Sequence, residues 1–159
     1  MTTYQKGGAV VHTLRETVGA ENFWKAINVY LTRHKFQNVE TTNLQRAMEE
    51  ASKMDLDWFF RQWVYGGGYP KIKVERNYNA QTKRLELSVK QVQEANKLTP
   101  EAFVLPMEIE ITTATGVKIE NLKITKREET FSIKSDEEPT KIVFDKNEKI
   151  PLKTIKIES

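Results

Sequence analysis

The sequence predicts an α+β protein in two parts: an all-α helical segment at residues 1–70, then an antiparallel β-sandwich at residues 71–159. In the first part, apolar residues recur every three or four positions, as on one face of an amphipathic helix. In the second part, they alternate with polar residues, as in strands that bury one face. The period changes at three glycines and a proline, Gly66 to Pro70, and both residue types end helical structure.

The first two helices are expected at about residues 4–18 and 21–34. Gly19 stands where the C-terminal cap of the first helix belongs, because glycine adopts the left-handed conformation without strain. Apolar stripes run along both helices and look too wide for four short helices to bury. We therefore expect an exposed apolar surface near Val10, Leu14 and Phe23, through which the chain forms a homodimer.

The third and fourth helices carry start signals of their own. Thr42 and Gln45 form a Thr-x-x-Gln pattern, which is typical of a capping box. Asp55 is the expected N-cap of the fourth helix. That helix concentrates large apolar residues, and we interpret its aromatic cluster of Trp58, Phe59, Trp63 and Tyr65 as core.

About seven short strands are expected after residue 70, because alternating runs are separated by turn signals. One run changes phase: Val117 and Ile119 are odd-numbered, whereas Leu122 and Ile124, the next apolar pair, do not continue that series. This change predicts a bulge or a break in the strand. The longest stretch without strand character covers residues 94–100.

The composition narrows the classes of function. The chain has 159 residues, 38% hydrophobic and 30% charged, as in a globular protein. We expect no membrane span and no signal peptide, since no apolar run has the necessary length. A net charge of +3 with mixed signs argues against nucleic acid as a partner. The absence of cysteine excludes thiolate metal sites and leaves the cellular compartment open.

A series of short motifs carries a resemblance to a known family. The chain begins with Tyr4-Gln-Lys-Gly, continues with a His34-x-Phe36-x-Asn38 pattern, and ends its helical part with a Trp58-Phe-Phe segment before the glycines. In order and spacing these elements resemble the zinc aminopeptidases of the aminopeptidase N and leukotriene hydrolase family. The resemblance implies that the helical part closes a gluzincin catalytic domain and that the sandwich is immunoglobulin-like.

The same resemblance assigns a role to Tyr4. In the family, the tyrosine of the Tyr-x-Lys-Gly element donates a hydrogen bond to the oxyanion that forms when zinc-activated water attacks the peptide carbonyl. A phenol suits this role because it is neutral at pH 7 and donates strongly. The residues alone also allow a simpler interpretation, in which the Tyr4 ring covers apolar surface near the N-terminus.

The family's zinc ligands have no counterpart in this sequence. A His-Glu-x-x-His motif places two imidazoles on one helix face, but the only histidines here are His12 and His34, and neither stands in that motif. His12 and Glu16 are four residues apart, a spacing that is usually an ordinary surface contact. We therefore expect this chain to bind no zinc, and the parent enzyme to hold zinc through an upstream catalytic domain.

These observations predict part of a hydrolase that removes N-terminal residues from peptide substrates. The chain supplies Tyr4 and a structural sandwich, and it is expected to be inactive alone. Two alternatives remain open: a non-catalytic adaptor that binds a protein partner, and a separate subunit that completes a split peptidase. The residues upstream of Met1 in the reading frame would distinguish the three.

Overall fold

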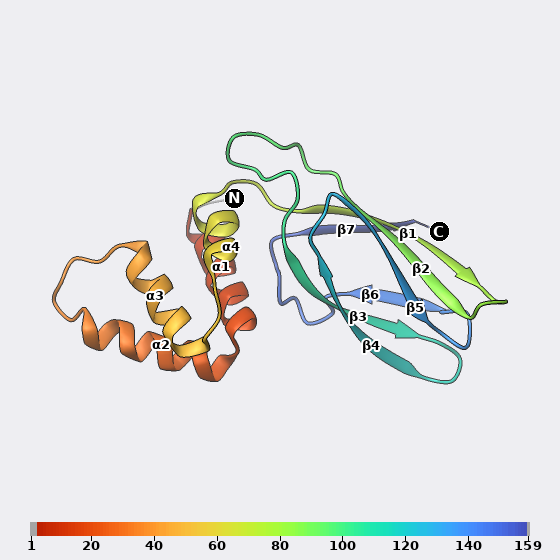
Figure 1. Cartoon of the computed structure of the whole chain (residues 1–159), viewed down its shortest axis with the longest axis horizontal. Helices are drawn as coiled ribbons and strands as arrows, with labels where there is room; N and C mark the ends of the chain where they lie inside the picture. The colour runs from red at the N-terminus through yellow and green to blue at the C-terminus, as the bar shows by residue number, and fades with distance from the viewer. Residues whose placement is uncertain (1–2, 159) are drawn as a thin grey trace. The chain divides into compact units, whose positions relative to one another are not determined.

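The computed structural model describes residues 3–158 and divides into two compact units, Met1–Gly66 and Gly67–Ser159. The first unit is helical and the second consists of two β-sheets, as the sequence predicts (Figure 1). None of the described helices combines the length and the apolar character needed to cross a bilayer.

The helical unit contains five consecutive elements. Residue periodicity places them close to the expected ranges. They are α1 (Thr3–Val18), α2 (Ala20–Arg33), α3 (Thr41–Ser52), α4 (Asp57–Phe60) and the π-helix η1 (Arg61–Tyr65).

Gly19 joins α1 to α2, as expected for a C-terminal cap. Its φ of 84° lies in the left-handed region, which residues with a Cβ rarely adopt. The N–H of Gly19 donates to the carbonyl of Arg15 at 2.9 Å and so closes the last turn of α1. The carbonyl of Gly19 in turn accepts from Phe23 at 2.9 Å and begins α2.

The capping box of α3 lies two residues earlier than predicted. Glu40 is the N-cap, and its side chain accepts the N–H of Asn43, while the Asn43 side chain accepts the N–H of Glu40 at 2.7 Å. Thr42 is inside the first turn and does not cap the helix. The Gln45 amide instead donates to Glu49 and Asp57, because it points to the side of α3 where α4 begins.

The fourth helix also begins later than predicted. Its N-cap position is Leu56, which has no side chain able to cap. The carboxylate of Asp55 nonetheless accepts the N–H of Asp57 at 2.9 Å, so the predicted residue still stabilises this turn. Part of the predicted aromatic core is present, since Phe59 and Trp63 are almost completely buried, together with Phe60. The prediction is wrong for Tyr65, which is 54% exposed because it lies at the end of the helical unit, where the chain leaves it.

The expected exposed surface near Val10, Leu14 and Phe23 is wrong, because all three side chains are buried. The apolar stripes of α1 and α2 are therefore buried by neighbouring residues that the sequence alone did not identify. Other large apolar side chains of the helical unit remain exposed. They are Tyr4, Val11, Trp24, Leu31, Phe36, Val39, Met54, Val64 and Tyr65.

The second unit forms two sheets from seven strands, the expected number. One sheet has the order β5-β2-β1-β7 and the other β4-β3-β6. All pairs are antiparallel except β1 with β7, which run parallel. The strands are β1 (Lys71–Asn79), β2 (Arg84–Gln91), β3 (Leu105–Thr112), β4 (Val117–Ile124), β5 (Glu128–Lys134), β6 (Lys141–Phe144) and β7 (Thr154–Glu158).

The predicted bulge or break near residue 120 is not found. Strand β4 runs unbroken and pairs residue for residue with β3, from Val117 opposite Thr112 to Ile124 opposite Leu105. Val117 and Ile119 are exposed, whereas Ile124 is buried. The change of phase in the sequence therefore reflects apolar residues on both faces of β4, which is a regular edge strand.

Hydrogen bonds from buried side chains secure the long connection between β2 and β3. The Gln91 amide donates to the carbonyl of Phe103 at 2.9 Å, and its carbonyl accepts the N–H of Phe103 at 2.9 Å. Gln93, also buried, donates to the carbonyl of Glu101 at 3.0 Å. Because an unpaired buried backbone group costs about 1–3 kcal/mol, these glutamines hold a segment that lacks sheet partners.

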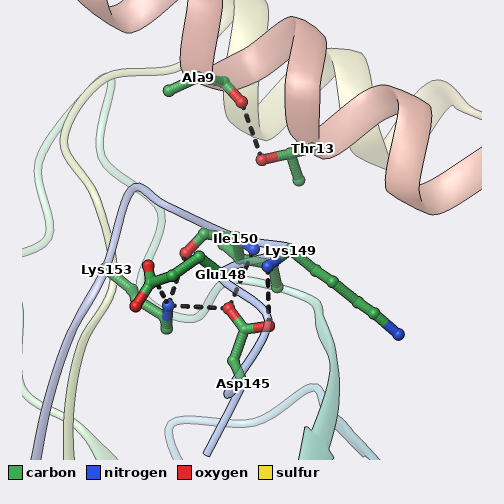
Figure 2. Close-up of polar contacts among 7 residues, drawn as sticks. All are labelled: Ala9, Thr13, Asp145, Glu148, Lys149, Ile150 and Lys153. Carbon is green, nitrogen blue, oxygen red and sulfur yellow. Dashed lines mark hydrogen bonds and ion pairs between the residues drawn. The ribbon is translucent and has the colours of Figure 1, made fainter.

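A buried ion pair organises the turn after β6 (Figure 2). The carboxylate of Asp145 accepts the N–H groups of Lys149 at 2.9 Å and Ile150 at 3.0 Å. The ammonium of Lys153 lies 2.7 Å from the same carboxylate and donates to the carbonyl of Ile150 at 2.9 Å. These contacts give both oxygens of the Asp145 carboxylate a partner and hold the backbone of the turn in place.

Candidate active-site tyrosine and the adjoining groove

Tyr4 lies in the first turn of α1, and 93% of its surface is exposed. A ring this exposed covers no apolar surface, so the simpler interpretation of the residue does not hold in this structure. The phenol is instead open to a group that approaches from outside. The residue belongs to a helix of 16 residues, α1, which places its backbone within regular structure.

Two kinds of contact support the beginning of α1. The ammonium of Lys6 donates to the carbonyl of Gly66 at 2.9 Å and so ties the first turn to the end of η1. Further along, the Thr13 hydroxyl donates to the carbonyl of Ala9 at 3.0 Å, as Figure 2 shows. Between these points lie Gly7 and Gly8, where an added Cβ would meet nothing within 4 Å.

A groove of about 720 Å³ opens beside Gly7, within the helical unit. This volume falls in the range of small-molecule and peptide side-chain sites, roughly 300–1,000 Å³. Most of its lining is apolar. The lining residues are Lys6, Gly7, Val10, Val11, Leu14, Tyr30, Val39, Glu40, Thr41, Leu44, Phe59, Phe60, Trp63 and Val64.

The described residues offer no set of zinc ligands. Within residues 3–158, the one group of three carboxylate or imidazole side chains close enough to share a metal is Glu49, Asp55 and Asp57, and it contains no histidine. Each of these carboxylates already accepts hydrogen bonds, Glu49 from the N–H of Leu56 at 3.1 Å. Neither histidine joins such a group, so a zinc ion of the family's type does not fit this chain.

The sequence did not reveal the groove. Leu14 and Phe59 lie 45 positions apart and line one groove only in the folded chain. Its one sequence signal is Gly7, since a glycine inside a helix costs about 1 kcal/mol relative to alanine.

These features define a class: a helical unit with exposed tyrosines and an apolar groove, followed in the chain by a β-sandwich. Residues 1–63 match the Peptidase family M1 domain, and residues 68–152 match the Domain of unknown function (DUF3458) Ig-like fold. The second match covers more than half of the chain, which therefore belongs to the DUF3458 family of Ig-like domains, and the helical part before it is similar to the Peptidase family M1 domain.

Known relatives are named as aminopeptidases. Aminopeptidase N of Escherichia coli (strain K12) is 34% identical over 91 residues, which are 57% of this chain and 10% of that protein. The Alanine/arginine aminopeptidase of Saccharomyces cerevisiae is 26% identical over 137 residues, 85% of this chain and 15% of that protein. The chain thus spans roughly a tenth of the length of the curated relatives it matches.

A solved structure shows the same fold. The aminopeptidase A of Legionella pneumophila, in complex with aspartic acid, matches 98% of this chain and 18% of its own with a TM-score of 0.78. The sequence identity is 19%, so this likeness concerns the fold. It includes both the helical part and the sandwich, in the order that the sequence predicts.

Proposed function

We propose that this chain works as the C-terminal part of a zinc-dependent aminopeptidase, in which Tyr4 stabilises the oxyanion of the tetrahedral intermediate. The main observation behind this proposal is that Tyr4 is 93% exposed on the first turn of α1, a helix within the residues that match the Peptidase family M1 domain. The names of the relatives support the reaction, which is the removal of N-terminal residues from peptides.

In this proposal the zinc ion belongs to an upstream part of the catalytic domain. When bound there, zinc supplies an activated water as the nucleophile. This chain contributes a neutral hydrogen-bond donor at Tyr4, held in place by α1 and by the bond from Lys6 to Gly66. The sandwich contributes support and no chemical group.

The test of Tyr4 uses a longer protein in which a segment with the His-Glu-x-x-His motif precedes this chain. Tyr4→Phe should lower kcat for an aminoacyl substrate by about 10²–10³, because one oxyanion donor is lost. KM and the thermal midpoint should stay nearly constant, since the exposed hydroxyl contributes nothing to the core. Tyr65→Phe, at another exposed tyrosine of the helical unit, is the matched control. Full activity of Tyr4→Phe would contradict the assignment.

The separate chain should hydrolyse nothing and bind no stoichiometric zinc. Elemental analysis after dialysis against zinc-containing and then zinc-free buffer measures the second point. One tightly held zinc per chain would overturn it and would direct attention to His12 and Glu16. Peptidase activity of the separate chain would overturn the first point, because it would require a metal site that residues 3–158 do not offer.

A further inference from the structure

The start of α1, which carries Tyr4, has a sequence that disfavours a helix. Its first turn contains no acidic side chain, which would stabilise the positive end of the helix dipole. Lys6 brings a positive charge to this end instead. Gly7 and Gly8 follow, and glycine is among the poorest helix-forming residues. The order of this turn therefore depends on contacts with other elements.

Lys6 makes such a contact with the end of the π-helix η1. Its ammonium donates to the carbonyl of Gly66 at 2.9 Å, across 60 positions of the chain. Both residues belong to the helical unit, so the contact is internal to that unit. A positive charge is unfavourable where α1 begins, but it is favourable beside the last carbonyls of a helix. The hydrogen bond thus places the Lys6 charge where the dipole of the other helix attracts it.

The surroundings of position 66 restrict it to glycine. A Cβ added there would lie 2.6 Å from the carbonyl oxygen of Gln62 and 2.9 Å from that of Arg61. Both oxygens belong to the backbone of η1, so a change of side-chain rotamer cannot relieve the overlap. Gly66 is extended, with φ −81° and ψ 169°, so the restriction comes from the close approach of the chain. Any larger residue would therefore displace the carbonyl that accepts from Lys6.

We propose that the hydrogen bond between Lys6 and Gly66 positions Tyr4 for catalysis, with Lys6 as a positioning residue and Gly66 as its acceptor. This inference rests on the proposed function, because it concerns the same tyrosine. Side chains two positions apart in an α-helix differ in direction by about 200° around the axis. Lys6 therefore secures the turn from nearly the opposite side to Tyr4, and its bond does not involve the phenol.

The expected size of the effect follows from how a hydrogen-bond donor acts. A donor stabilises an oxyanion only within a narrow range of distance, and a displacement of about 1 Å can lower the rate about 10²-fold. Loss of the bond to Gly66 should let the first turn of α1 open more often, since helix ends open readily. The rate should then fall, but by less than when the Tyr4 hydroxyl itself is removed.

The first experiment changes the donor, in the longer protein that carries the His-Glu-x-x-His segment. Lys6→Met should lower kcat by about 10–100-fold and leave KM within about twofold, because the substrate binds but the phenol is misplaced. Lys6→Arg should retain most of the activity, since a guanidinium can donate to the same carbonyl. Lys25→Met, at an exposed lysine of α2, is the matched control and should change neither constant.

The second experiment changes the acceptor. Gly66→Ala should lower kcat by a similar factor, because the added methyl group displaces the Gly66 carbonyl. The double variant Lys6→Met/Gly66→Ala should be no less active than the weaker single variant, since both changes remove one hydrogen bond. Thermal unfolding of each variant separates this effect from a loss of fold. Multiplication of the two effects would overturn the proposal.

A third comparison tests whether Lys6 acts through Tyr4. In a protein that already carries Tyr4→Phe, Lys6→Met should lower kcat by less than about twofold, because the group that it positions is absent. An undiminished effect of Lys6→Met in that background would overturn this inference and leave the role of Tyr4 intact. Full activity of Tyr4→Phe alone would instead overturn the proposed function, and this inference with it.

Hydrogen exchange of the separate chain gives a readout without activity. The N–H groups of residues 7–9 close the first turns of α1, since each bonds to the carbonyl four residues earlier. Lys6→Met should speed their exchange at least about fivefold, whereas Lys6→Arg and Lys25→Met should not. Unchanged exchange in Lys6→Met, or unchanged kcat in the longer protein that carries it, would overturn the positioning role of Lys6.

Discussion

The helical unit and the sandwich unit differ in how many of their large apolar side chains are exposed. Among the described residues, nine of the exposed large apolar side chains belong to the helical unit and five to the longer sandwich unit. Two facing sheets can bury both inner faces, whereas a few short helices of about 12 to 16 residues leave one side of each helix without a neighbour. The helical unit therefore leaves more large apolar side chains exposed than the sandwich unit, although it is the shorter of the two.

The units also differ in how they use polar groups. In the sandwich unit, buried side chains such as Gln91 and Asp145 satisfy backbone groups that the sheets leave unpaired. In the helical unit, the buried amide of Gln45 instead joins side chains, since it donates to Glu49 and Asp57.

The largest expected effect comes from separating the units. The sandwich should unfold cooperatively when made alone, whereas the helical part should lose near-ultraviolet circular dichroism and bind ANS. Two pieces of the chain, which begin at residues 67 and 71, test our proposed domain boundary after residue 70. A piece from residue 67 should be more stable than one from residue 71 by about 1–2 kcal/mol, since the N–H of Gly67 donates to the carbonyl of Leu98 at 2.8 Å. A sandwich that does not fold alone would contradict the comparison.

A large effect is also expected at the buried ion pair. Lys153→Met should lower the free energy of unfolding by about 3–5 kcal/mol, because it leaves the Asp145 carboxylate buried without its cation. Lys118→Met, in an exposed pair with Glu120, is the control and should change it by well under 1 kcal/mol. Urea unfolding measures both. Equal effects of the two substitutions would show that the sandwich does not depend on internal polar contacts.

The smallest effects, of opposite sign, concern glycines. Gly8→Ala should raise the free energy of unfolding by about 0.5–1 kcal/mol, because the position is helical and open. Gly68→Ala should lower it by more than about 1 kcal/mol, since its φ is 69° and an added Cβ would lie 2.7 Å from the Thr99 side chain. Thermal unfolding in one buffer gives both values. A stabilising Gly68→Ala would show that the backbone around Gly68 and the Thr99 side chain can move apart more easily than the structure indicates.

Local sequence determined most elements, because their causes lie within a few residues. The helix-to-strand change of period at Gly66 to Pro70 predicted both halves, and Gly19 predicted the first helix end, since only glycine enters that conformation readily. Start signals were less exact. Glu40 caps α3 in place of Thr42, because several nearby polar side chains compete and packing decides where the helix begins.

The candidate site divides in the same way. The Tyr4-Gln-Lys-Gly motif identified the tyrosine from the sequence, as a family resemblance that remains to be tested by Tyr4→Phe. The groove that begins at Lys6, in contrast, is lined by residues far apart in the chain. Burial of Val10 and Leu14, which the sequence placed at the surface, depends on which helices meet. Periodicity fixes the face of a helix, but only tertiary packing decides what that face touches.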